Sequence, residues 1–195
     1  MNRHLLILDL DETLVFATED PLSYTPDFQL EDYSVYYRPY LNQFLAQVFD
    51  GFQVAVWSSA GTSYVQEVVE LIFSNPNALE FIWSAKRCTQ RYDAMDSAFY
   101  WIKNLKKVKR RGFNLDRVLM IDDTPQKLEK NYGNLIQVRP FEGDRSDTEL
   151  RDLLPFLDSL RTMDNVRKVE KRHWRNSPWS KRLPPASPLP ATADH

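Results

Sequence analysis

Short apolar runs recur along the chain, and they predict the strands of a buried sheet. The first run, residues 5–10, contains five aliphatic residues and one acid, Asp9. A nearly continuous apolar run of this length is typical of a strand that is buried on both faces, as in a parallel sheet. Further strands are predicted by similar runs at residues 52–57, 81–84, 117–121 and 135–138.

Apolar residues at helical spacing predict helices between these strands. In residues 39–49 an apolar stripe follows Pro39, which suits the first position of a helix, and Gly51 ends the pattern. Ser146 and Glu149 have the spacing of a capping box at the start of the last helix. The remaining helices are expected at residues 62–73, 100–111, 126–132 and 146–160.

This alternation of strands and helices predicts an α/β fold: a single Rossmann-like domain with a central parallel sheet flanked by helices. Residues 15–34 are acidic and aromatic without a clear period, so we expect a long loop there. It is either a binding flap or a passive surface loop, and a short strand follows at residues 35–38. The flap is the only cap that we expect.

Composition divides the chain into a folded part and a tail. Residues 1–165 are predicted to form the domain, and residues 166–176 a terminal helix or extension. Residues 177–195 are rich in proline and serine and have too little apolar content to pack, so we expect a disordered tail.

The net charge and the cysteine content limit the partners and the cellular compartment that we expect. The 195 residues carry a net charge of −2, which offers no global attraction to nucleic acid or to a membrane surface. No apolar run approaches the roughly 20 residues of a membrane span, and the start of the chain lacks a signal-peptide pattern. The single cysteine, Cys88, excludes an intramolecular disulfide and suits a reducing compartment. We therefore predict a cytoplasmic protein without a membrane partner.

Polar side chains follow three of the predicted strands. Asp9 and Asp11 end the first strand, Ser58 follows the second, and Asp122 and Asp123 follow the fourth. In open α/β sheets the carboxyl ends of the strands meet at the edge where ligands bind. Carboxylate oxygens are ligands that Mg²⁺ prefers, and a hydroxyl can hold a phosphate oxygen. The pattern predicts a site for one Mg²⁺ and one phosphate at this edge.

Lys103 would add an ammonium group to this site. Each of these residues could also have a purely structural role. Residues 9–13 could form an acid-rich turn or helix N-cap, Ser58 could cap the following helix, and Lys103 could be a solvated helix lysine with basic neighbours.

The motifs together resemble one known family. Residues 9–14, Asp-Leu-Asp-Glu-Thr-Leu, are similar to the first motif of the haloacid-dehalogenase superfamily phosphatases. More narrowly, the chain resembles the branch that contains the small phosphatases of the RNA polymerase II carboxy-terminal domain and the Tim50-like proteins. The other similar segments are residues 38–45, 56–60, 100–105, 118–125 and 146–157, and the resemblance covers roughly residues 4–165.

This resemblance implies a Mg²⁺-dependent phosphoric monoester hydrolase that works through an aspartyl-phosphate. Asp9 would be the nucleophile, and Asp11 would protonate the leaving group and then deprotonate the attacking water. Thr13 would help to fix the turn, Ser58 would donate to a phosphate oxygen, and Lys103 would neutralise charge and pair with Asp9. The implied phosphate ligands are Ser58, Ser59, Lys103 and Arg87, and the implied metal ligands are Asp9, Asp11 (through its backbone carbonyl), Asp122 and Asp123.

Two residues depart from the pattern of this branch. Asp123 stands where asparagine is usual, and Arg87 directly precedes Cys88, whereas the related arginine lies three residues before the cysteine. The chain keeps every catalytic side chain, which favours an enzyme over a non-catalytic binding or translocation module of the same fold.

We expect phosphoserine or phosphothreonine proteins, or another large partner, as substrates. A flap cannot bury most of a small ligand's surface, which is the usual route to tight small-molecule binding. Small-molecule phosphates and nucleic-acid 3′-phosphates are the alternatives, and the net charge of −2 disfavours the latter. The oligomeric state is left open. The aromatic residues that either contact the partner or pack the flap are Tyr24, Phe28, Tyr33 and Tyr36.

Overall fold

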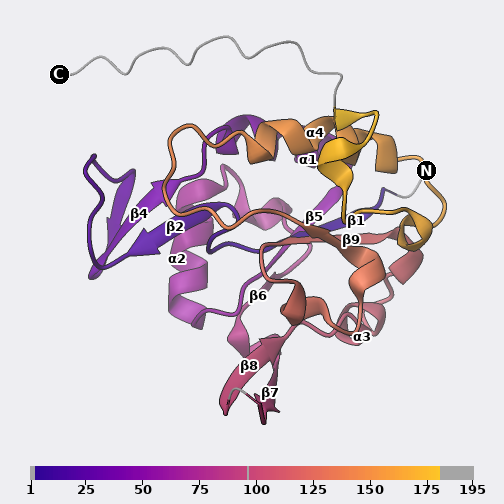
Figure 1. Ribbon diagram of the computed structural model, residues 1–195, viewed down its shortest axis with the longest axis horizontal. Helices are drawn as coiled ribbons and strands as arrows, with labels where there is room; N and C mark the ends of the chain where they lie inside the picture. The colour runs from indigo at the N-terminus through magenta and orange to yellow at the C-terminus, as the bar shows by residue number, and fades with distance from the viewer. Residues whose placement is uncertain (1–2, 96, 181–195) are drawn as a thin grey trace.

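The computed structural model describes residues 3–95 and 97–180, and a parallel sheet of five strands lies at its centre (Figure 1). The strands follow the order β10-β9-β1-β5-β6, so β1 is the middle strand. Each pairing in this sheet is parallel, and the predicted α/β class is confirmed. The bounds are Leu5–Leu8 for β1, Gln53–Trp57 for β5, Ile82–Trp83 for β6, Val118–Asp122 for β9 and Leu135–Gln137 for β10.

Both faces of β1 are covered, which explains why its sequence is apolar without alternation. Leu6 and Leu8 belong to the larger hydrophobic core, whereas Leu5 and Ile7 belong to a second core. Helices α1 (Leu41–Gly51), α2 (Thr62–Ile72) and α4 (Glu149–Leu160) pack their apolar stripes into the first core, and the short helix α3 (Lys106–Lys109) packs into the second. Short 3-10 helices lie at Pro76–Ala78, Ala85–Arg87, Leu115–Arg117, Pro125–Leu128, Tyr132–Asn134, Val166–Lys168 and Trp174–Asn176.

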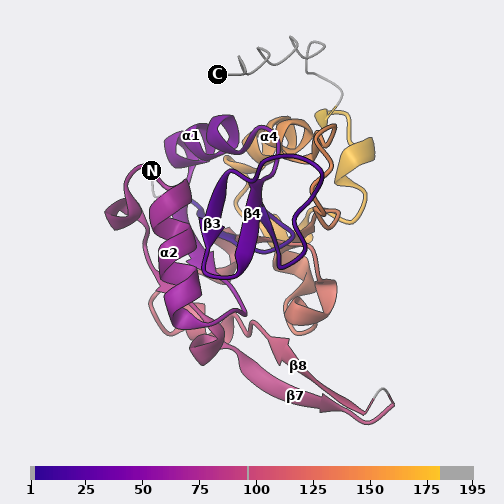
Figure 2. The ribbon, with the colours of Figure 1, turned by 90° about the vertical axis from the view of Figure 1, so that its left-hand side faces the viewer.

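Two small antiparallel sheets are inserted after strands of the central sheet. The segment after β1 forms the flap, a three-stranded sheet with the order β2-β4-β3. The segment after β6 forms the hairpin β7–β8, which projects away from the body of the protein (Figures 1 and 2). The bounds are Val15–Thr18 for β2, Phe28–Leu30 for β3, Tyr33–Tyr37 for β4, Thr89–Asp93 for β7 and Ala98–Ile102 for β8.

The flap is more ordered than the sequence suggested. Strand β4 confirms the short strand expected near residues 35–38, but residues 15–34 were predicted as a loop and contain β2 and β3. Both strands gain their hydrogen bonds by pairing with β4, so the segment forms a sheet despite its weak period.

The helix predicted at residues 100–111 is wrong in its first half. Tyr100 to Ile102 belong to β8, as suits aromatic and β-branched side chains, and only Lys106–Lys109 is helical. Asn104 separates the two elements, because its side-chain oxygen accepts the backbone N–H of Lys106 and turns the chain.

Three predicted helix boundaries also change. Helix α1 begins at Leu41, and Tyr40 before it has a φ of 67°, so Pro39 is not the first helical residue. The capping box is absent: Ser146 Oγ donates to Asp144, and the side chain of Glu149 accepts the N–H of Arg139. The helix expected at residues 126–132 is reduced to the 3-10 helix Pro125–Leu128, which is followed by a turn.

The chain after α4 returns to the larger core through 3-10 turns. Trp174 is buried and stacks on Phe156 with the ring centroids 6.2 Å apart. Residues 177–180 fall within the expected tail, yet they are described, and Trp179 packs against the core. Residues 181–195 of that expected tail lie outside the described residues. Within residues 3–95 and 97–180, we find no helix with the length and apolar content to cross a membrane.

Candidate active site

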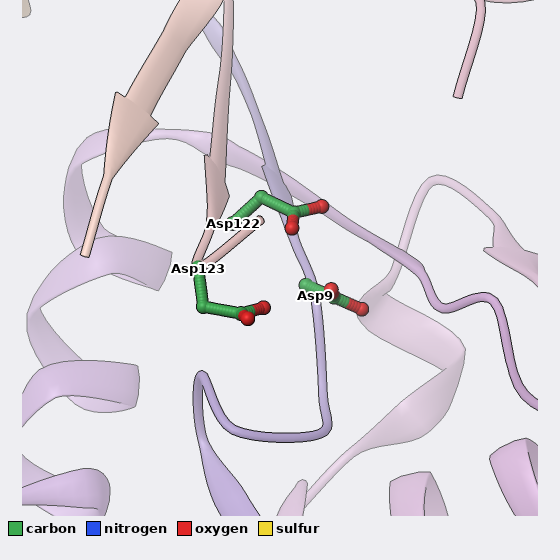
Figure 3. A group of neighbouring side chains, drawn as sticks. All are labelled: Asp9, Asp122 and Asp123. Atoms are coloured by element: carbon green, nitrogen blue, oxygen red, sulfur yellow. The ribbon is translucent and has the colours of Figure 1, made fainter. Parts of the chain in front are cut away.

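Three buried carboxylates meet where β1 and β9 end (Figure 3). Leu8 of β1 pairs with Ile121 of β9, and the backbone N–H of Asp9 donates to the Ile121 carbonyl at 3.0 Å. This register places Asp9 beside Asp122 and Asp123, and one oxygen of each carboxylate lies within 4.8 Å of the others. We call these three residues the acid triad. Repulsion among them requires cations nearby.

Lys103 is a buried counter-ion of two triad members. Its Nζ lies 2.8 Å from Asp9 Oδ2 and 2.7 Å from Asp122 Oδ2, and its side chain is 0% exposed. The alternative of a solvated helix lysine is therefore wrong. Burial acts to raise the pKa of the Asp9 carboxyl, but the ammonium groups of Lys103 and Lys127 outweigh it and hold that pKa below its ordinary value. Asp9 is thus kept ionised. Burial and the charge of Asp9 raise the pKa of Asp122.

Lys127 is a second cation that the sequence did not reveal as part of the site. Its Nζ lies 3.0 Å from Asp9 Oδ2, 3.6 Å from Asp122 Oδ1 and 3.6 Å from Asp123 Oδ1. The 3-10 helix Pro125–Leu128 carries it back over the end of β9. The signal available in the sequence was its position four residues after Asp123, a spacing at which side chains can meet on a helix.

Asp11 is held in a different way from Asp9. It is partly exposed, and it accepts hydrogen bonds from Tyr64 Oη at 2.5 Å and from Ser58 Oγ at 3.3 Å. Burial raises the pKa of Asp11, and the charge of Asp9 adds to this, against the two hydrogen bonds. A raised pKa favours the protonated carboxyl, as a general acid requires. Tyr64, on α2, is a further site residue that sequence reasoning missed.

Ser58 lies in the site and does not cap α2. Its Oγ accepts the N–H of Ala60 at 3.0 Å, whereas the residue that precedes the helix at the cap position is Gly61. Thr13 is buried beneath the site, and its carbonyl accepts a hydrogen bond from Arg38 at 3.1 Å. Ser58 is thus held by the backbone N–H of Ala60 in the segment after β5, and Thr13 is held by Arg38 in the segment after β1.

Ser59 and Arg87 differ from the other predicted phosphate ligands. Ser59 is half-buried in the turn after β5. Arg87 is exposed, and its guanidinium lies 5.3 Å from the centre of the Trp83 ring. Among the described residues we find no contact between Arg87 and the acid triad, so the structure does not bring this residue to the site.

The acid triad fits a hard divalent cation. Its donor atoms are all carboxylate oxygens, which Mg²⁺ prefers. One of them, Oδ1 of Asp123, is buried and receives no hydrogen bond within the described part of the chain. Such an atom is costly to bury unless a cation satisfies it, and the nearest one is the Lys127 ammonium at 3.6 Å. The residues present can therefore hold the metal that the motifs implied.

A cavity of about 410 Å³ opens beside Asp11, between the flap and α2. Tyr33 and Tyr64 line it, together with the acids Glu31 and Glu67. Of the flap aromatics named above, Tyr33 is exposed at this cavity, whereas Tyr36 is fully buried, which agrees with the alternative that it packs the flap. The cavity therefore offers space for a bound molecule directly beside Asp11.

Comparison with known proteins identifies the family. A family model described as NLI interacting factor-like phosphatase matches residues 4–167. The chain belongs to this family. This assignment confirms the resemblance to the haloacid-dehalogenase phosphatases of the carboxy-terminal-domain branch, and it covers nearly the same residues.

Several curated proteins are similar in sequence. CTD small phosphatase-like protein 2 of Dictyostelium discoideum is 30% identical over 169 residues, which are 83% of this chain and 28% of that protein. CTD nuclear envelope phosphatase 1B of Danio rerio is 30% identical over 188 residues, which are 89% of this chain and 73% of that protein. The chain thus spans less than a third of the first of these relatives and about three quarters of the second.

Solved structures show the same fold. The fission yeast RNA polymerase II CTD phosphatase Fcp1 bound to beryllium fluoride superposes with a TM-score of 0.54 at 22% identity. The superposition covers 82% of this chain and 50% of that chain. At this level of identity the likeness establishes the fold, and the chemistry has to be argued from the residues of the site.

Proposed function

We propose that this protein is a Mg²⁺-dependent phosphatase that hydrolyses phosphomonoesters through an aspartyl-phosphate on Asp9. The observation that carries the proposal is the contrast between two neighbouring carboxylates. Asp9 contacts two ammonium groups and is kept ionised, whereas Asp11 is bonded to Tyr64 and Ser58 and has a raised pKa. A nucleophile and a general acid are the two roles that this contrast supports.

In the proposed first step, an oxygen of Asp9 attacks phosphorus and the bond between phosphorus and the leaving oxygen breaks. Asp11 gives its proton to that oxygen, so the product leaves as a neutral alcohol. The ammonium of Lys103 and the hydroxyl of Ser58 stabilise the charge on the phosphoryl oxygens. Mg²⁺, when bound by Asp9, Asp122, Asp123 and the Asp11 carbonyl, would screen the negative charges of nucleophile and phosphate.

In the second step, Asp11 acts in the reverse direction. Now ionised, it removes a proton from a water molecule whose oxygen attacks the phosphorus of the aspartyl-phosphate. The bond between phosphorus and the Asp9 oxygen breaks and inorganic phosphate leaves. Asp9 is again ionised and Asp11 is again protonated, so the cycle is closed. Thr13 supports both steps by fixing the turn that joins the two carboxylates.

We propose a phosphorylated serine or threonine of a protein as the substrate. The cavity beside Asp11 is open at the flap and can admit a side chain that remains attached to a large partner. The similar curated proteins are named CTD phosphatases, and the similar solved structure is named an RNA polymerase II CTD phosphatase, which is consistent with a macromolecular substrate. Free metabolites are disfavoured, because the cavity beside Asp11 is bounded by the flap and α2 and no separate cap domain is present within the described residues.

The alternative to an enzyme is a non-catalytic binding or translocation module of the same fold. The buried Lys103 and the paired Asp11 support the enzyme, because together they keep one carboxylate ionised and favour the protonated form of its neighbour. We also propose a reducing, cytoplasmic setting, supported by the free buried thiol of Cys88. A fluorescent fusion would distinguish this from the nuclear envelope, which the name of one relative suggests.

The test is release of phosphate from phosphopeptides, sugar phosphates and nucleotides, measured with Mg²⁺ and with a chelator. We expect turnover that needs the metal and is abolished by Asp9→Asn, with the fold retained by circular dichroism. Asp20→Asn, which removes an exposed acid of the flap, is the matched control and should keep full activity. An Asp9→Asn variant that keeps more than a few per cent of the wild-type rate would overturn the proposal.

A further inference from the structure

Lys127 contacts the acid triad more completely than Lys103 does. Its ammonium reaches all three carboxylates, whereas Lys103 reaches only Asp9 and Asp122. The oxygens that it contacts include Asp123 Oδ1, the buried atom that receives no hydrogen bond from the described residues. Lys127 is therefore the group that neutralises the third carboxylate of the triad.

The position of this ammonium conflicts with a bound divalent cation. Both cations are attracted by the same three carboxylates, and two positive charges held by the same buried groups repel each other. Three carboxylates and two ammonium groups leave the cluster with one excess negative charge. A divalent cation would turn this into one excess positive charge, which favours the departure of one ammonium group.

Only one of the two lysines has room to move. The Lys103 side chain is 0% exposed, and the Lys127 side chain is 19% exposed. The backbone of Lys127 is fixed, because its carbonyl accepts the N–H of Lys103 at 2.7 Å and its N–H donates to the Thr124 carbonyl at 3.1 Å. The side chain can thus leave the carboxylates toward solvent while the 3-10 helix remains in place.

We propose that Lys127 is the resident counter-ion of the metal site, which competes with the divalent cation and leaves the carboxylates when that cation binds. This inference rests on the proposed function, since it assumes that the acid triad takes Mg²⁺.

The inference predicts two properties of a variant that lacks the Lys127 ammonium group. The metal-free form should be less stable, because Lys103 alone remains to balance three buried carboxylates. The metal should bind more tightly, because no resident cation has to be displaced. The gain in melting temperature on adding Mg²⁺ should therefore be larger than in the wild type, since ligand binding to the folded state raises its stability.

The experiment compares the full chain with Lys127→Met and Lys127→Gln. Titration calorimetry gives the Kd for Mg²⁺, and thermal melts with a chelator and with saturating Mg²⁺ give the stability gain. We expect the Kd to fall about tenfold in both variants, which corresponds to about 1.4 kcal/mol. Lys130→Met, which removes an exposed positive charge three residues away, is the control and should change the Kd by less than twofold.

Each outcome decides the inference. Tighter binding and a larger Mg²⁺ stabilisation in the Lys127 variants support it, as does a variant that folds only with Mg²⁺. Unchanged or weaker binding in the variants, with normal binding in the wild type, overturns the inference and leaves the proposed function standing. If neither the wild type nor the variants bind Mg²⁺, both fail. If only the variants bind it, the counter-ion role is supported, and the metal dependence of the wild type is not.

Discussion

Arg38 and Asp147 lie 109 residues apart in the chain and form an ion pair with two hydrogen bonds, from Nε to Oδ1 at 3.0 Å and from Nη2 to Oδ2 at 2.8 Å. The guanidinium also donates to the carbonyls of Thr13 and Arg139. One buried side chain therefore ties the turn after β1 to the segments that follow β10 and precede α4. Lysine cannot reproduce this planar set of donors.

Arg38→Lys is expected to lower the free energy of unfolding by about 1–3 kcal/mol, because lysine keeps the charge but leaves some of the acceptors that Arg38 now serves without a hydrogen bond. Urea denaturation of the full chain measures the difference. The control is Arg161→Lys, since Arg161 pairs with Asp158 at the surface, where such pairs contribute about 1 kcal/mol or less. Equal stability of the two variants would show that the Arg38 network has no special structural role.

Asp11→Asn is expected to separate the two steps of the proposed reaction. Asparagine cannot remove a proton from water, so an aspartyl-phosphate formed from an activated aryl phosphate should accumulate. Turnover should fall by about 10²- to 10⁴-fold, the usual contribution of general acid–base catalysis. Intact-protein mass spectrometry after rapid quenching would detect the added phosphoryl group. Its absence in Asp11→Asn, together with normal turnover, would remove Asp11 from the acid–base role.

The open cavity predicts a preference for large substrates. We expect kcat/KM for a phosphoserine peptide to exceed that for a sugar phosphate by at least about tenfold, equivalent to about 1.4 kcal/mol of transition-state binding. Tyr33→Ala should reduce the value for the peptide and leave that for p-nitrophenyl phosphate unchanged, because Tyr33 lines the cavity beside Asp11. Tyr132→Ala, another exposed tyrosine, is the control. A sugar phosphate that outperforms every phosphopeptide would contradict this prediction.

His4 should make the fold sensitive to acid. Burial lowers the pKa of its imidazole, whose Nε2 lies 2.8 Å from the Met163 carbonyl oxygen. Protonation therefore favours the unfolded chain, so the stability from neutral His4 is complete above pH 6.5, the ordinary pKa, and is lost as the pH falls through the lower folded value. Melting temperatures at pH 7.5 and 5.5 should differ less in His4→Gln than in the wild type. An equal difference would assign the acid sensitivity to other groups.

The central sheet and the acid triad could be predicted because their signals are local. A strand buried on both faces has to be continuously apolar, so residues 5–10 and 117–121 were recognisable, and the acids that follow them mark the edge of the sheet. Parallel pairing of β1 with β9 then brings those acids together. Nothing beyond the strand pattern and the topology was needed.

The parts that could not be predicted depend on partners distant in the sequence. Lys127 meets Asp9 across 118 residues, and Tyr64 meets Asp11 across 53. The spacing of Lys127 from Asp123 hints at its contact with the triad, but no local spacing indicates the contact of Tyr64 with Asp11. The hairpin β7–β8 has mostly exposed or half-buried side chains and therefore lacks the alternation that marks a strand with one buried face. Residues 100–102 could then be read as the start of a helix.

The two inserted sheets leave the pairing of β1 with β9 undisturbed. Asp9 directly follows β1 and Asp122 is the last residue of β9. The strands of the flap pair only with one another, and so do the two strands of the hairpin. Either insertion can therefore change in length or surface without shifting the register of β1 against β9. If the proposed substrate binds at the cavity that the flap lines, exchanging the flap for that of a relative should alter the preference for substrates and leave the acid triad in place.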